Sequence, residues 1–117
     1  MKTYSLKKEG KVFAFEINNF FITLIEVKKV IEETENVSEI RHGSRQDIKS
    51  GIYLIFDFNR VDCMVWEPYA DNSRYWIGPV EDDIIIDDFN LVEKSFQKYS
   101  LWSLLLGKIG GQVKTNS

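Results

Sequence analysis

The sequence contains little cysteine and little histidine, and each shortage excludes a class of protein. Its 117 residues include one Cys (Cys63), one His (His42) and two Pro. A single cysteine cannot form an internal disulfide, which agrees with a reducing compartment. One Cys and one His are too few for the usual structural zinc site. No apolar run approaches the roughly 20 residues that a transmembrane helix needs.

Signals for export and for catalysis are also lacking. The N-terminal "MKTYSLKKEGK" has no apolar core of a signal peptide, so we expect a cytoplasmic protein. No GxSxG, P-loop, GxGxxG or HExxH motif occurs. Cys63 lies among apolar neighbours in a predicted strand, where a thiol acts as a small hydrophobe. His42 is expected in an exposed loop. We therefore expect no catalytic residue, no cofactor and no metal.

What is present is apolar material and an uneven distribution of charge. Apolar residues make up 44% of the chain and aromatic residues 14%, enough for the core of one domain. We place this domain at residues 1–111 and a flexible tail at 112–117. The net charge is −3, but residues 57–91 hold nine acids against two arginines and therefore carry −7. Nucleic-acid binding normally shows a basic stripe, so a basic protein partner fits this segment better.

Alternation of apolar and polar residues predicts an antiparallel sheet. "KVFAFEI" places Phe13, Phe15 and Ile17 on one face, after a turn at Gly10 that joins it to an earlier strand. "VSEIRHGS" is a short strand leading into the loop "GSRQDIKSG". "GIYLIFDFN" and "VDCMVWE" form a hairpin around Asn59 and Arg60. "DDIIIDD" is predicted as a last strand.

Helical spacing predicts two amphipathic helices. The first is capped by Asn18 or Asn19 and ends near Asn36. Its apolar face is formed by Phe20, Leu24, Val27 and Ile31. The second is capped by Asp87 or Asp88, and "LWSLLLGKIGG" continues it. The predicted order is β-β-α-β-β-β-(β)-α. This is an α+β fold, a single antiparallel sheet with both helices packed on one face.

The stretch "VWEPYADNSRYWIGP" at 65–79 has two interpretations. In the first, it is a hairpin in which Trp66 ends one strand, Tyr75, Trp76 and Ile77 begin another, and the aromatic residues pack the sheet. In the second, Trp66 and Trp76 pair at the base of the same hairpin and form a rigid support that presents Tyr and Arg to a partner. The second interpretation, joined to the following acids, predicts a partner-binding surface. Its members are Glu67, Tyr69, Asp71, Asn72, Arg74, Tyr75, Trp76, Glu81, Asp82 and Asp83.

The segment "FDFNRVDCMVWEPYADNSRYWIGP", following a β-β-α unit, resembles small bacterial immunity proteins of contact-dependent growth inhibition and polymorphic toxin systems. The resemblance lies in general character, since those proteins are also small, acidic, α+β and without catalytic motifs. It implies a stoichiometric inhibitor that binds a cognate, basic toxin domain, for example a nuclease. No nucleic acid and no membrane is expected as a partner.

Three alternatives remain. A small-molecule-binding or regulatory module would use Trp66, Tyr75 and Trp76 to line a cleft. An enzyme would depend on His42 or on the carboxylates. Homodimerisation through "LWSLLLG" is less favoured than burial of that segment against its own domain.

Overall fold

The computed structural model describes residues 1–20, 22–69, 73–81 and 83–99. The predicted tail and the segment "LWSLLLGKIGG" lie outside these residues. Within them the elements are β1 (Thr3–Lys8), β2 (Lys11–Asn18), α1 (Leu24–Glu32), β3 (Val37–His42), α2 (Arg45–Lys49), β4 (Ile52–Phe58), β5 (Val61–Trp66), β6 (Arg74–Pro79) and α3 (Asn90–Lys98).

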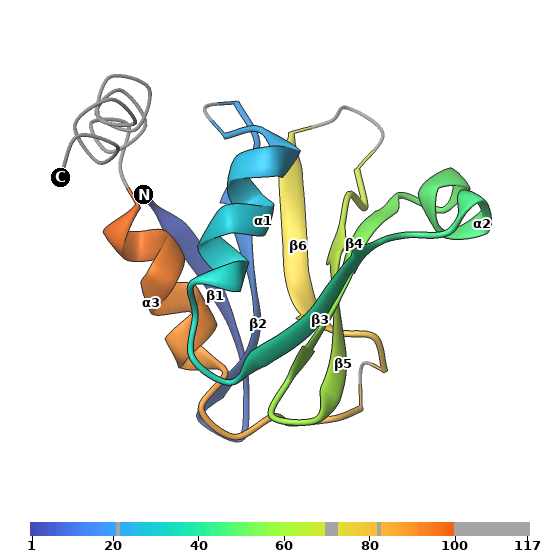
Figure 1. Ribbon diagram of the computed structural model, residues 1–117. Coiled ribbons are helices and arrows are strands. Elements are labelled where there is room, and N and C mark those ends of the chain that lie inside the picture. Colours follow the sequence, from blue (N-terminus) through green and yellow to red (C-terminus); the bar gives the residue numbers. More distant parts are fainter. Residues whose placement is uncertain (21, 70–72, 82, 100–117) are drawn as a thin grey trace, which may run out of the picture.

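The six strands form a single antiparallel sheet in the order β1-β2-β6-β5-β4-β3 (Figure 1). The predicted α+β class and the single antiparallel sheet are therefore confirmed. The described residues contain three helices, not two, because the polar segment after β3 forms the short helix α2. Ser44 and Asp47 make a reciprocal capping box there, which stabilises a helix too short to show an apolar period.

The sixth strand comes from the hairpin that was one interpretation of residues 65–79, and not from the predicted last strand. The "DDIIIDD" segment contains no strand among its described residues, and Ile86 enters the core from an irregular segment. The "RYWIGP" segment forms β6 instead and occupies a central place in the sheet, between β2 and β5. A central strand pairs on both sides, so β6 joins the N-terminal hairpin to the rest of the sheet.

Both predicted tight turns are present. Asn59 and Arg60, between β4 and β5, have φ angles of 49° and 67°. Glu9 and Gly10, between β1 and β2, have φ angles of 51° and 76°. Two successive residues with positive φ match the twist of an antiparallel hairpin, and this geometry explains both two-residue connections.

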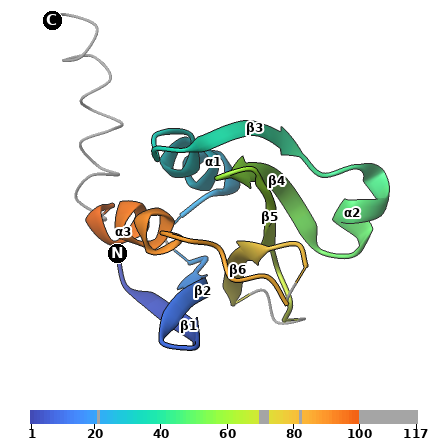
Figure 2. The same cartoon turned by 90° about the horizontal axis from the view of Figure 1, so that it is seen from below.

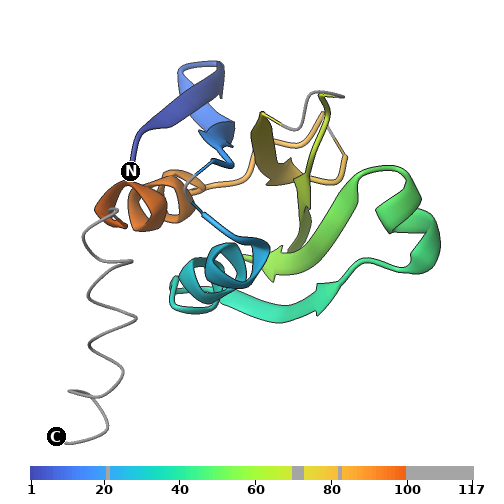
Figure 3. The ribbon, with the colours of Figure 1, turned by 90° about the horizontal axis from the view of Figure 1, so that it is seen from above.

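The core lies between the sheet and the helices α1 and α3. Figures 2 and 3 show these two helices side by side, with α2 at the far end of the molecule. The α1 helix contributes Val27, Val30 and Ile31, and α3 contributes Val92 and Phe96. The strands contribute the fully buried Phe15, Ile17, Leu54, Phe56, Phe58, Cys63, Val65 and Ile77.

The helix boundaries differ from those predicted. The α1 helix begins one turn late, because Thr23, and not Asn18 or Asn19, is its N-cap and accepts a hydrogen bond from the Glu26 amide at 3.3 Å. Phe20 consequently lies outside the helix and is 81% exposed. The helix ends at Glu32, before Asn36.

The α3 helix also lacks its predicted cap. Phe89 holds the N-cap position and makes no side-chain capping bond. Asp88 lies just before it with φ of 63°, a left-handed turn residue, and Asp87 forms an ion pair with Lys11 at 3.4 Å. The N-cap position is held by Phe89 because its ring packs in the core against Phe15. A polar capping side chain is therefore absent from this position.

A β-bulge in β2 separates Phe13 from Phe15. Leu6 pairs with Ala14 whereas Lys7 pairs with Val12, so Phe13 is an extra residue without a partner in this register. An extra residue reverses the alternation of side chains between the two faces. Phe15 is fully buried in the core, whereas Phe13 lies on the other face. The prediction that Phe13, Phe15 and Ile17 share a face was therefore wrong for Phe13.

Candidate functional site: an aromatic groove on the sheet

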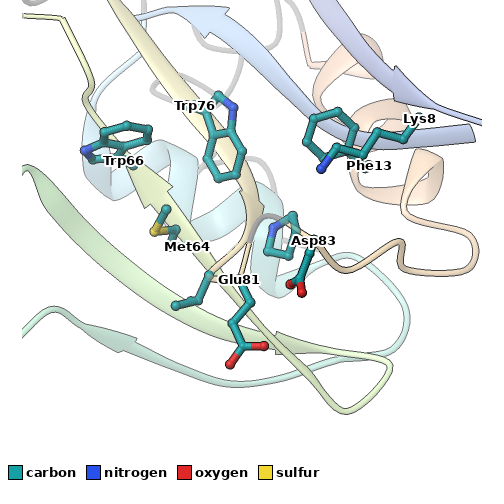
Figure 4. A pocket seen from close by; sticks show the side chains of 9 residues that line it. Lys8, Phe13, Met64, Trp66, Trp76, Glu81 and Asp83 are labelled. Carbon is teal, nitrogen blue, oxygen red and sulfur yellow. The ribbon is translucent and has the colours of Figure 1, made fainter.

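The sheet face opposite α1 and α3, here called the open face, carries a wide groove of about 810 Å³ (Figure 4). We call it the Trp76 groove, after its central residue. Its walls come from β1, β2, β5 and β6 and from the segment after β6. The lining residues are Lys8, Phe13, Met64, Trp66, Trp76, Pro79, Val80, Glu81 and Asp83.

Two tryptophans form the aromatic wall of the groove. Trp66 on β5 and Trp76 on β6 are paired across the two strands. Their ring centroids are 5.8 Å apart and the planes meet at 78°, an edge-to-face contact. The indole N–H of Trp66 donates to the Ser50 carbonyl oxygen at 3.2 Å, which fixes the ring against the end of α2. The predicted pairing of the two tryptophans is therefore confirmed, and it gives a preformed surface.

Gly78 allows the Trp76 ring to lie along its own strand. A Cβ atom placed on Gly78 would be 2.7 Å from Cη2 of Trp76 and 2.6 Å from the Cβ of Ala14 on β2. Real Cβ atoms do not approach that closely, so only glycine fits beneath the ring. The glycine thus sets the position of the indole within the groove.

Charged residues border the groove at its other edges. Glu81 and Asp83 follow β6 and are exposed. Figure 4 shows the Glu81 carboxylate below Trp76 and the Asp83 carboxylate below Phe13 and Lys8. The amide of Val80 donates to the Asp62 carbonyl oxygen at 2.9 Å and anchors this segment to β5. The Lys8 ammonium, on the side of Trp76 away from Trp66, lies 4.4 Å from the centroid of the Phe13 ring (Figure 4).

A second polar cluster lies on the same face and centres on Glu16. This residue is only 7% exposed. Its carboxylate pairs with Arg74 Nη1 at 3.0 Å and accepts a hydrogen bond from the Tyr69 hydroxyl at 2.9 Å. The Arg74 guanidinium also stacks 3.8 Å above the ring of Tyr4. Glu16 and Tyr4 were missed from the sequence because their partners lie far along the chain.

The structure divides the predicted partner-binding residues into separate groups. Trp76, Glu81 and Asp83 line the groove. Tyr69 and Arg74 belong to the Glu16 cluster, where both bind within the chain. Asp71, Asn72 and Asp82 lie outside the described residues.

Tyr75 and Glu67 lie on the core side of the sheet, near Tyr53. Tyr75 is 9% exposed and packs edge-on against Tyr53, so it does not project as predicted. Alternation explains this, because Trp76 faces the groove and its neighbour must face the core. Burial raises the pKa of Tyr75, and the Glu67 carboxylate adds to the effect. Tyr75 therefore does not line the groove with Trp66 and Trp76.

The predicted environment is found for Cys63 and only in part for His42. Cys63 is fully buried, which confirms it as a core residue. His42 is exposed but ends strand β3 and is not in a loop. Among the described residues no three His, Cys, Asp or Glu side chains gather in a group suited to a metal ion.

The buried thiol predicts a loss of stability in alkali. Burial, with the charges of Asp57 and Asp62, raises the pKa of Cys63 from 9.0 to about 12. Above pH 9 the unfolded chain releases this proton and the folded chain retains it, so stability falls by roughly 1.4 kcal/mol per pH unit at most. Urea unfolding across this window should show a steeper decline for the wild type than for Cys63→Val. Equal slopes would contradict a buried neutral thiol.

Comparisons with protein-family models, with curated proteins and with solved structures found no match. Within the part of the chain that the structure describes, no helix has the length and apolar character required to cross a membrane.

Proposed function

We propose that this chain is a protein-binding module whose open face docks a basic partner, and that it acts as an immunity protein against a cognate toxin domain. The observation that supports this most is the Trp76 groove, in which a fixed pair of tryptophans lies beside exposed carboxylates. Tryptophans dominate binding energy at protein interfaces. A fixed surface loses little conformational freedom on binding.

The charge of the open face supports a basic partner. Asp57 and Asp62 lie directly opposite each other on β4 and β5, a pairing of like charges that costs stability. Strand alternation places both on the open face, since Phe56 and Cys63 beside them are in the core. Together with Glu81 and Asp83 they extend the acidic edge. Such a field attracts basic proteins at long range.

The identity of the partner as a toxin domain, for example a nuclease, follows the resemblance of the sequence to immunity proteins. In this proposal the protein acts in the cytoplasm of the producing cell and binds its partner stoichiometrically. Acidic groups on the open face would cover the positive track by which a nuclease holds its substrate. Inhibition then requires no catalytic group in this chain.

The test combines capture with growth rescue. Tagged wild-type protein is incubated with native lysate at low salt, and retained proteins are identified by mass spectrometry. We expect a basic partner that stops bacterial growth when expressed alone and is neutralised by co-expression of the wild-type chain. A retained partner that is harmless would contradict the immunity role, and no retained partner would contradict the binding role.

Charge reversal on the groove should separate its role from that of net charge. Glu81→Lys with Asp83→Lys is expected to slow association by about tenfold at low salt and to abolish growth rescue. The matched control is Glu33→Lys with Glu35→Lys, which changes the charge equally at exposed positions at the end of α1. The comparison requires association rates measured at several salt concentrations. Equal slowing by both pairs would place the docking surface elsewhere.

A further inference from the structure

The Glu16 cluster shows how this face holds a guanidinium group. Arg74 stacks 3.8 Å above the ring of Tyr4 and at the same time pairs with Glu16 at 3.0 Å. The aromatic face attracts the cation through its quadrupole, and the carboxylate accepts its N–H groups. On the open face, the guanidinium of this strand residue is thus held between one ring and one carboxylate.

The Trp76 groove repeats these two components without an arginine among its lining residues. Trp76 and Trp66 supply indole rings, the aromatic group that binds cations best. Glu81 and Asp83 supply exposed carboxylates in the same groove, Glu81 below Trp76 and Asp83 below Phe13 in Figure 4. The Lys8 ammonium, 4.4 Å from the Phe13 centroid, shows that a cation is held against an aromatic ring within the same groove.

The shape of the groove selects among cations. It is open and about 810 Å³ in volume, much larger than a cage for a single ammonium group. A guanidinium is flat, stacks on an aromatic ring and offers a fork of N–H donors to a carboxylate, whereas an ammonium is a compact point charge. The groove therefore matches the geometry of arginine better than that of lysine.

We infer that the Trp76 groove receives an arginine side chain of the partner, which stacks on Trp76 and pairs with Glu81 or Asp83. The inference rests on the proposed function, since it names the side chain by which a basic partner is recognised. It makes arginine the anchor at the centre of the interface. The neighbouring acidic residues of the open face would then guide the partner and contribute less to the final affinity.

The test uses short peptides and the isolated protein. Three acetylated, amidated peptides of the form Gly-Ser-X-Ser-Gly carry arginine, lysine or citrulline at X. Binding is followed by the NMR shifts of the indole N–H groups of Trp66 and Trp76. We expect the arginine peptide to shift the Trp76 signal, with a Kd at least about fivefold lower than that of the lysine peptide. Citrulline has a similar shape to arginine but no charge, so the citrulline peptide should not shift the Trp76 signal.

Substitutions at the groove test whether the arginine peptide binds there. Glu81→Gln with Asp83→Asn should weaken the arginine peptide about tenfold. Asp87→Asn with Asp88→Asn removes the same charge from exposed positions outside the groove and should leave Kd unchanged. Equal binding of arginine and citrulline, no shift at either tryptophan, or equal weakening by both pairs of substitutions would each overturn the inference.

The inference and the proposed function fail in different ways. A protein that captures a basic toxin but does not bind the arginine peptide keeps its proposed function and loses the arginine anchor. A protein that binds the peptide as expected but retains no basic partner from lysate keeps the arginine site and loses the immunity role.

Discussion

Replacing Phe15 with alanine is expected to lower the free energy of unfolding by about 3–5 kcal/mol. Phe15 is fully buried, and its ring centroid lies 5.5 Å from that of Phe96 and 6.0 Å from that of Phe89. Removal of the ring leaves a cavity where β2 meets α3, and aromatic neighbours cannot collapse into it easily. Urea unfolding followed by circular dichroism measures the change.

Phe13→Ala is the matched control two residues earlier. Because the bulge places Phe13 on the open face, this substitution should cost about 1 kcal/mol or less. It should instead perturb the groove, where the Phe13 ring lies beneath the Lys8 ammonium. Similar losses of stability for Phe13→Ala and Phe15→Ala would contradict the bulge and restore the simple alternation.

Gly78→Ala is expected to destabilise the protein by about 1–3 kcal/mol. This is the reverse of the usual effect, because alanine is normally less destabilising than glycine within a strand. The added methyl group would meet the Trp76 ring and the Cβ of Ala14 at less than 3 Å. Relief requires the indole to leave its position or β2 to move away from β6. Thermal unfolding, together with the fluorescence of the tryptophans, measures both the loss of stability and the displacement of the ring.

A second substitution tests which contact is responsible. Ala14→Gly in the Gly78→Ala background moves the methyl group from one strand to its neighbour and removes the contact between the two Cβ atoms. We expect part of the stability to return, while the altered fluorescence remains because the Trp76 contact persists. Full recovery of both signals would show that the indole imposes no constraint on Gly78. No recovery would assign the whole effect to the indole.

The sequence predicted the parts of the fold that depend on local patterns. The β4–β5 hairpin follows from two alternating runs separated by Asn59 and Arg60, which tolerate positive φ. The strand β6 was harder to recognise, because its position depends on pairing with β2, far away in the sequence. The helix α2 is only five residues long, and its one local signal was the spacing of Ser44 and Asp47.

Only part of the candidate site was predicted, because the sequence shows local patterns and not long-range contacts. Trp66 and Trp76 were found because an aromatic pair at the ends of two strands is a local pattern. Tyr75 was misplaced because it was expected to project with Arg74 and Trp76, although in a strand beginning there adjacent side chains point to opposite faces. The bulge at Phe13 has no signal in the apolar pattern, and it decides which aromatic rings reach the groove.

The pairing of β2 with β6 joins Phe15 to Ile77, two positions far apart in the chain. The Trp76 groove takes Lys8 and Phe13 from one side of this junction and the tryptophans from the other. It therefore exists only after this long-range pairing has formed, and no chain that lacks the pairing presents it. A partner that binds the groove selects native molecules alone, so its concentration adds to their stability by mass action and protects newly made chains from proteolysis.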